Sequence, residues 1–143
     1  MPIRKNPGRP MVGKRFLHYE VLDKLGEGAG GAVYKAVDLR LDRIVAVKFL
    51  SPSKLNWDDH RARFEQEARA ISALNHPSIA TLFDVGSQDS NLFLVLEYLP
   101  GGTLKSEVQR HLKLGHLLSI QKVLGYGGQI ASGLLYAHNH GIV

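Results

Sequence analysis

Short runs of β-branched and aromatic residues fill the first part of the chain, and turn-forming residues separate them. Runs of this length and composition are typical of strands. The predicted strands are Tyr19–Leu25, Ala32–Val37, Ile44–Leu50, Ile79–Val85 and Leu92–Tyr98. The first three strands follow one another through connections that are too short for parallel crossovers. The pattern therefore predicts a five-stranded antiparallel sheet in an α+β fold.

One helix is predicted between the third and fourth strands, over about Trp57–Leu74. Phe64 and Ile71 lie on its apolar stripe, and Glu67 falls on the same stripe at helical spacing from both. We therefore expect the Glu67 carboxylate to face the core. The residues that would begin and end this helix are Asn56, Asp59 and Pro77.

Helical periodicity also follows the last predicted strand. After the break at Pro100-Gly101-Gly102, a short helix is predicted from Thr103 and a longer helix from Ser119 to about Asn139. The first residues of the chain are instead rich in proline, glycine and basic residues, a composition typical of a flexible flank. The expected organisation is a basic flexible flank over 1–15, a β-rich part with one helix over 16–99, and helices over 100–143.

Net charge changes this picture little, because the excess is confined to one end. The 143 residues include 18 Lys and Arg, 13 Asp and Glu, and no Cys. The basic residues of the flank account for the whole excess, so the remainder is neutral and offers no basic face to nucleic acid. We expect no nucleic-acid partner. No apolar run approaches the roughly 18 residues of a membrane span, so we expect no membrane segment in this chain and a cytoplasmic location.

The segment from Gly26 to Val33 matches the pattern GxGxxGxV. In a dinucleotide-binding fold these glycines would open a helix, but here the chain continues as a strand through Val37. A Walker A loop would require Gly-Lys followed by Ser or Thr, and this is absent. The remaining interpretation is a glycine-rich hairpin whose backbone amides approach phosphate oxygens closely.

Lys48 ends the run Val45-Ala46-Val47-Lys48 in a strand that is otherwise apolar. A buried cation is strongly disfavoured unless it is paired, and Glu67 on the predicted core stripe is the candidate partner. In the alternative interpretation, Lys48 extends to solvent from a strand end and Glu67 lies on a solvated edge.

The glycine-rich loop, the lysine and the helix glutamate, in this order, resemble the small lobe of a protein kinase. The resemblance covers about residues 19–143 and is strongest to bacterial serine/threonine protein kinases of eukaryotic type. It also rests on three further stretches: Arg63-Phe64-Glu65-Gln66-Glu67-Ala68-Arg69, Leu74-Asn75-His76-Pro77-Ser78-Ile79 and Leu96-Glu97-Tyr98-Leu99-Pro100-Gly101-Gly102-Thr103-Leu104. It implies a small lobe with an ATP-binding loop over 16–99 and the first helices of a large lobe over 100–143.

The resemblance also implies a set of ATP-binding residues. Lys48 and Glu67 would serve catalysis, Leu96 would be the gatekeeper, and Glu97 and Leu99 would hydrogen-bond adenine through their backbones. The residues implied to contact ATP are Leu25, Gly26, Glu27, Gly28, Ala29, Gly30, Gly31, Ala32, Val33, Ala46, Lys48, Leu96, Glu97 and Leu99.

The stretch from Leu135 to Val143 resembles the run that leads into the HRD catalytic loop of the family. No HRD-x4-N, DFG or APE motif occurs in the 143 residues, so the catalytic Asp and the Mg²⁺ ligands of the family are missing. We expect an N-terminal half of a kinase domain, truncated just before HRD. It would contain no metal site and show no activity alone, while the full-length enzyme would transfer the ATP γ-phosphate to protein Ser or Thr. The alternative is a non-catalytic nucleotide-binding or regulatory interaction module.

Overall fold

The computed structural model describes residues 11–28, 30–50, 57–88 and 91–142. The chain divides into two compact units. A sheet unit consists of Met1–Ala73 and Thr81–Tyr98, and a helical unit consists of Leu74–Ala80 and Leu99–Val143. Ala29 and Asn56, which were assigned roles from the sequence, lie outside the described residues, as does the flank up to residue 10.

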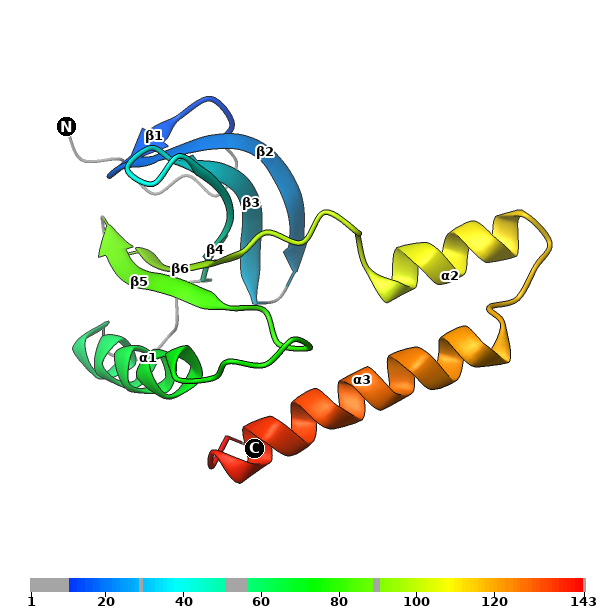
Figure 1. Ribbon diagram of the computed structural model, residues 1–143. Helices are drawn as coiled ribbons and strands as arrows, with labels where there is room; N and C mark the ends of the chain where they lie inside the picture. Colours follow the sequence, from blue (N-terminus) through cyan, green and yellow to red (C-terminus); the bar gives the residue numbers. More distant parts are fainter. Residues whose placement is uncertain (1–10, 29, 51–56, 89–90, 143) are drawn as a thin grey trace. The chain divides into compact units, whose positions relative to one another are not determined.

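The sheet unit contains one antiparallel sheet with the strand order β1-β2-β3-β4-β6-β5 (Figure 1). Its strands are β1 (Arg15–Phe16), β2 (Tyr19–Gly28), β3 (Gly31–Asp38), β4 (Arg43–Phe49), β5 (Leu82–Gln88) and β6 (Asn91–Glu97). The α+β class and the antiparallel sheet are thereby confirmed. The described sheet has six strands rather than the predicted five, because a two-residue strand is too short to show a period-two pattern.

The hydrophobic core lies on one face of this sheet. Tyr34 of β3 pairs with Val47 of β4, which pairs with Val95 of β6, and all three side chains are buried. The Phe16 ring lies 5.3 Å from the Phe93 ring, edge to face. The complete buried cluster is Phe16, Tyr19, Val21, Tyr34, Ala36, Val45, Val47, Phe93 and Val95. Alternate positions of the strands supply it, as the period of a strand requires.

Residues 11–15, which lie in the predicted flexible flank, make backbone and core contacts with this unit. Met11 packs against the core. The Gly13 amide donates a hydrogen bond to the Val21 carbonyl over 2.8 Å, and the Val21 amide donates to the Lys14 carbonyl over 2.9 Å. These backbone bonds, which composition does not encode, order the segment that precedes β1.

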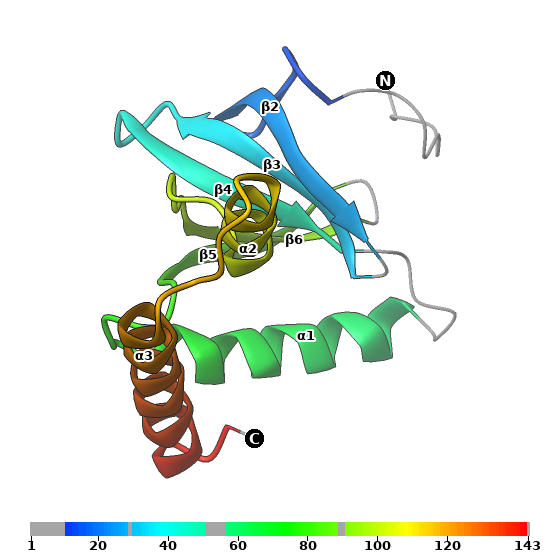
Figure 2. The ribbon, with the colours of Figure 1, turned by 90° about the vertical axis from the view of Figure 1, so that its right-hand side faces the viewer.

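The helix α1 (Trp57–Ser72) packs beside β5, and Figure 2 shows it below the strands of the sheet. Phe64 and Ala68 are buried, one helical turn apart. Glu67 is exposed, so the prediction that its carboxylate faces the core is wrong in this conformation. Ala68 rather than Glu67 continues the buried stripe from Phe64, which rotates the glutamate toward solvent.

The helical unit contains α2 (Leu104–Lys113) and α3 (Ile120–Asn139), as predicted after the Pro100-Gly101-Gly102 break. Thr103 caps α2: its hydroxyl accepts a hydrogen bond from the Ser106 amide, while the Ser106 hydroxyl accepts one from the Thr103 amide. Ser119 caps α3 by accepting a hydrogen bond from the Lys122 amide. These caps satisfy amides at the start of each helix that no helical carbonyl can reach, and only the α2 cap is reciprocal.

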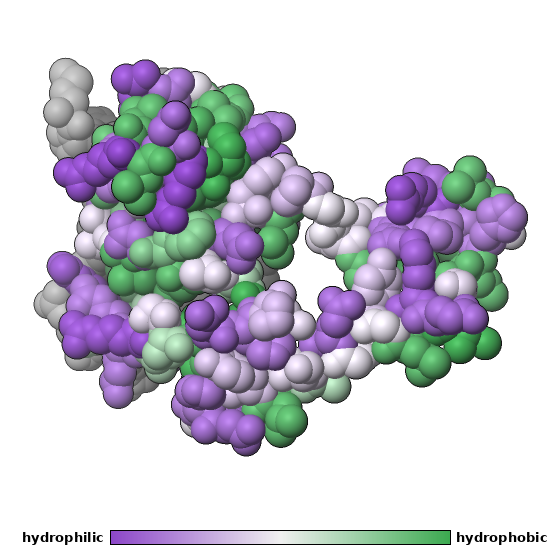
Figure 3. Space-filling view, viewed as in Figure 1, coloured by the Kyte–Doolittle hydropathy of each residue, from purple (hydrophilic) through white to green (hydrophobic). Residues whose placement is uncertain are grey.

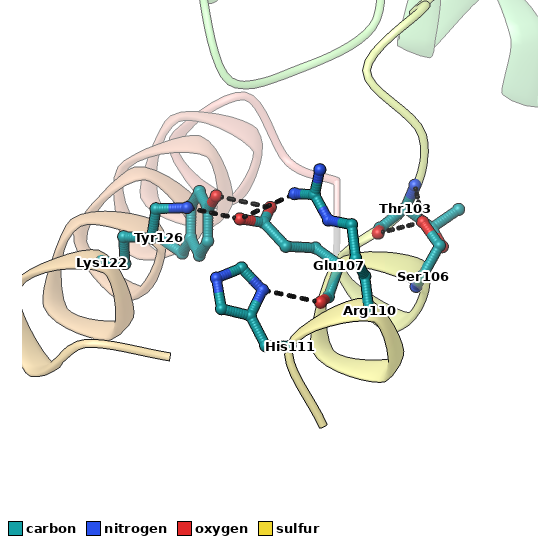
Figure 4. A network of polar contacts seen from close by, with 7 residues as sticks. All are labelled: Thr103, Ser106, Glu107, Arg110, His111, Lys122 and Tyr126. Carbon is teal, nitrogen blue, oxygen red and sulfur yellow. Dashed lines mark hydrogen bonds and ion pairs between the residues drawn. The ribbon is translucent and has the colours of Figure 1, made fainter. Parts of the chain in front are cut away.

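A carboxylate joins the two helices (Figure 4). Glu107 of α2 accepts hydrogen bonds of 2.7 Å from Lys122 Nζ and 2.7 Å from the Tyr126 hydroxyl, both on α3. Arg110 adds an ion pair at 3.8 Å. The hydrogen bond from Lys122 is the main reason that the pKa of Glu107 is lowered, and the same bond raises the pKa of Lys122.

The segment Leu74–Ala80 docks on α3. His76 Nε2 lies 3.1 Å from the Ser132 hydroxyl, and the His76 ring lies 5.1 Å from the Tyr136 ring. A Cβ atom at Gly133 would lie 3.3 Å from the Ser78 carbonyl oxygen, so a glycine allows this close approach. The predicted strand Ile79–Val85 is therefore shifted to Leu82–Gln88. Its first residues instead form a turn in which the Ile79 amide donates to the His76 carbonyl.

Apolar side chains remain uncovered on the helical unit, and hydrophobic residues are visible among the polar ones over α2 and α3 (Figure 3). Leu117, Ile120 and Leu124 are 81%, 75% and 69% exposed. Within the described part of the chain, α2 buries no residue and α3 buries only Gly133. None of the described helices combines the length and apolar character needed to cross a bilayer.

Candidate functional site

The glycine-rich loop is the turn between β2 and β3, where Gly28 pairs with Gly31. Gly31 has a φ of +116°, a conformation that side-chain-bearing residues rarely adopt. A Cβ atom at this position would lie 1.9 Å from the Phe49 carbonyl oxygen. Only glycine fits here, because the loop backbone runs against the end of β4.

The register of the sheet brings several of the predicted site residues together. Val33 pairs with Lys48, which pairs with Leu94, and in the next row Lys35 pairs with Ala46, which pairs with Leu96. Directly paired residues point to the same face of a sheet. These two rows alternate with the buried rows, so Val33, Ala46, Lys48 and Leu96 share the face opposite the core.

Lys48 lies under the loop. A Cβ atom at Gly30 would lie 3.4 Å from Lys48 Nζ and 3.7 Å from Cε. No side chain of Gly30 stands between the loop backbone and the ammonium group. Lys48 is half-buried, and it has no ion pair with any carboxylate in the described part of the chain. A cation beside an open turn of backbone amides is an arrangement that attracts phosphate oxygens.

The predicted ion pair between Lys48 and Glu67 is not formed among the described residues, since Glu67 is exposed. In this conformation Glu67 agrees with the alternative interpretation, in which it lies on a solvated edge. The pair was predicted for a nucleotide-ready conformation, and for that conformation it stays a prediction.

The remaining predicted site residues differ in their exposure and in their contacts. Leu25 lies at a β-bulge of β2 and is exposed, and Glu27 forms an ion pair with Lys24 that raises the pKa of Lys24. Glu97 is held by Thr81: the Glu97 amide donates to the Thr81 carbonyl over 2.8 Å, and the Thr81 amide donates to Glu97 Oε2 over 3.2 Å. Leu99 belongs to the helical unit and is 57% exposed.

Sequence reasoning missed Lys35. It lies two residues after Val33 in β3, so the strand period alone puts it on the same face as the predicted site. Its ammonium group lies over the ring of Tyr98, 4.9 Å from the ring centroid. Tyr98 separates the two residues that were predicted to bind adenine through their backbones.

The described part of the site supplies cationic and amide groups rather than a cluster of metal ligands. Within the described residues, no three His, Cys, Asp or Glu side chains come together as a metal site would require. The described residues therefore do not fit a bound Mg²⁺ ion, whose preferred ligands are carboxylate oxygens.

A family model described as the protein kinase domain matches residues 19–143. The chain belongs to the protein kinase family. Serine/threonine-protein kinase PrkC of Bacillus subtilis is 35% identical over 134 residues, which cover 93% of this chain and 20% of that protein. The probable serine/threonine-protein kinase PknB of Lactococcus lactis is 35% identical over 134 residues, or 92% of this chain and 21% of that protein.

The solved structures give the same assignment for the fold. The crystal structure of the Mycobacterium tuberculosis PknI kinase domain matches with a TM-score of 0.76 at 30% identity, over 90% of this chain and 51% of that one. The sheet with α1 is thus a kinase small lobe, and α2 and α3 are the first helices of a kinase large lobe. The chain spans about a fifth of the curated kinases and about half of the solved kinase domain.

Proposed function

We propose that this chain is the ATP-binding part of a serine/threonine protein kinase domain. The observation that carries the proposal is the position of Lys48 Nζ beside Gly30, on the same sheet face as Val33, Ala46 and Leu96. A cation and open backbone lie at one end of this face and apolar side chains at the other. A nucleotide has the same division, with anionic phosphates at one end and an apolar base at the other.

The residues of this chain would bind and orient ATP, which supplies the phosphoryl group. The backbone of the glycine-rich loop and the Lys48 ammonium group would attract the phosphates. Val33, Ala46 and Leu96 would cover the adenine ring, and the backbone of Glu97 and Leu99 would hydrogen-bond its edge. The family resemblance, together with the shared face of the sheet, supports these assignments.

Phosphoryl transfer requires further groups. In the family, the HRD and DFG motifs supply the catalytic base and Mg²⁺ ligands, and neither motif occurs in these 143 residues. We therefore expect this chain alone to bind ATP weakly and to transfer no phosphate. In a longer protein that carries those motifs, protein Ser or Thr would be the acceptor, as the names of the bacterial relatives suggest.

A binding experiment tests the nucleotide site. Isothermal titration with ATP should give weak binding that is lost in Lys48→Met, which removes the charge and keeps an apolar stem. Lys105→Met is the matched control, because Lys105 is an exposed lysine of α2 in the other unit. Unchanged ATP affinity in Lys48→Met would contradict the proposed site and favour an interaction module that does not use this loop.

A phosphate-transfer experiment tests whether this chain binds ATP but needs the HRD and DFG motifs for transfer. Labelled γ-phosphate should not pass from ATP to a generic protein substrate with this chain, but it should with a version extended through HRD and DFG. Transfer by the short chain that Lys48→Met abolishes would overturn the proposal, because residues assigned no role here would then supply the base and the metal ligands.

A further inference from the structure

The ring of Tyr98, the last residue of the sheet unit, is in contact with a lysine. Lys35 Nζ lies over this ring, 4.9 Å from its centroid. An ammonium group within about 6 Å of an aromatic face is attracted by the ring quadrupole. Both residues are half-buried, so water screens the contact only in part.

The register explains how a residue of β3 reaches the end of β6. Lys35 pairs with Ala46, and Ala46 pairs with Leu96, so the three residues form one row across β3, β4 and β6. The middle residue of the row is an alanine, which leaves room for the Lys35 stem above β4. Tyr98 follows Leu96 by two positions, where the lysine head contacts its ring.

The backbone that follows Tyr98 has little else to hold it. Glu97 is fixed by its two hydrogen bonds with Thr81. Every residue from Leu99 to Ser106 is exposed. Tyr98 is therefore the last position at which the sheet can set the direction of the Glu97–Leu99 backbone.

We propose that Lys35 is a positioning residue for nucleotide binding: by holding the Tyr98 ring, it fixes the Glu97–Leu99 backbone in the orientation that binds adenine. The inference rests on the proposed function, since that function brings adenine to this backbone. Lys35 acts through Tyr98 and needs no contact with the nucleotide. Its effect is preorganisation, which improves affinity by reducing the ordering that binding must otherwise impose.

The test uses this chain with two probes, adenosine and ATP, and four variants. Lys35→Met removes the charge and keeps the stem, whereas Lys35→Arg keeps a cation over the ring. Tyr98→Leu removes the ring, whereas Tyr98→Phe keeps it. Adenosine lacks phosphates, so its affinity reports the adenine contacts separately from Lys48.

We expect Lys35→Met and Tyr98→Leu each to weaken adenosine and ATP about two- to five-fold, the range for a partly exposed cation–π contact. The double variant should be no weaker than either single variant, because both remove one contact. Lys35→Arg and Tyr98→Phe should bind as the parent does. In proton spectra, the upfield shift of the Lys35 ε-methylene should disappear in Tyr98→Leu.

Two results would contradict the positioning role of Lys35. They are additive losses of affinity in the variant that combines Lys35→Met with Tyr98→Leu, and an unchanged adenosine affinity in Lys35→Met. If the parent chain binds neither probe, the proposed function fails. Hydrogen exchange of the Tyr98 and Leu99 amides then tests by itself whether Lys35 holds this backbone. Exchange about two- to five-fold faster in Lys35→Met, but not in Lys35→Arg, would support it, and equal exchange would overturn it.

Discussion

The sheet unit and the helical unit differ in what holds each of them together. In the sheet unit, nine described side chains form one buried cluster, and Val21, Val45, Val47 and Val95 are completely buried. In the helical unit, α2 and α3 bury a single described residue, Gly133, and expose several large apolar side chains. The sheet has its own hydrophobic core, whereas the helices are joined by polar contacts and by apolar side chains that stay partly exposed, such as Val123 and Ile130.

Because of this difference in burial, we expect the two units to differ in stability although both have regular secondary structure. The sequence of α3 contains Gly125, Gly127 and Gly128, each of which costs roughly 1 kcal/mol relative to Ala in a helix interior. Contacts through Glu107, His76 and Ser132 replace only part of the packing that such a helix requires. Most helical stability in proteins comes from burial of an apolar stripe. The apolar side chains of α3 are instead largely exposed.

Hydrogen exchange should give the largest contrast between the units. We expect the amides of β4 and β6 to exchange on the order of a thousand-fold more slowly than those of α3, because only the strands require opening of a buried core. Exchange measured by nuclear magnetic resonance or mass spectrometry checks this. Equal protection in the two units would refute the comparison.

Matched leucine truncations should give the next largest contrast. Leu92 of β6 is 2% exposed and Leu124 of α3 is 69% exposed. Leu92→Ala should lower the free energy of unfolding by about 2–5 kcal/mol, through lost burial and a cavity. Leu124→Ala should change it by less than about 0.5 kcal/mol. Urea denaturation measures both, and similar losses would mean that α3 is packed after all.

Alanine in place of glycine should have opposite signs in the two units. Gly31→Ala should destabilise the sheet unit by about 1–3 kcal/mol, since the added Cβ meets the Phe49 carbonyl oxygen at a positive φ. Gly128→Ala should stabilise α3 by about 1 kcal/mol, because a Cβ there meets nothing within 4 Å. Thermal denaturation followed by circular dichroism distinguishes the two signs.

The smallest expected effect is a pH dependence of the helical unit. The hydrogen bond from Lys122 lowers the pKa of Glu107 in the folded chain, so this contact stabilises the fold fully above the ordinary pKa of a glutamate. The stabilisation is lost as pH falls through the lowered pKa. Helix content measured against pH should therefore show an acid loss that is absent in Glu107→Gln. An identical pH profile in Glu107→Gln would show that the ionised Glu107 carboxylate does not stabilise the helices.

Much of the sheet could be predicted because the period-two pattern of a strand is visible in the local sequence. Val45 and Val47 alternate with Ala46 and Lys48 in the sequence, so the strand period puts the two valines on the core face and the other two residues on the site face. The two-residue strand β1 offers no such period. The exposed position of Glu67 depends on how α1 is rotated against β5, which helical spacing alone does not determine.

Contacts that depend on tertiary register could not be predicted. The docking of Leu74–Ala80 on α3 joins His76 to Ser132, 56 positions later in the chain, and this moved the predicted fourth strand by three residues. The contact of Lys35 with Tyr98 requires the register of three strands at once. By contrast, the loop and Lys48 are separated by a single hairpin, and the family resemblance already implied that they belong to one site.

The strand order also has a consequence for the growing chain. β6 lies between β4 and β5 but is the last strand to leave the ribosome, after α1 and β5. Until Asn91–Glu97 emerges, β4 has an open edge, and β5 has no partner in the sheet. Nascent chains with open edges are prone to pair with one another. Arg43 at the start of β4 and Lys48 near its end carry charges that would discourage such pairing during that interval.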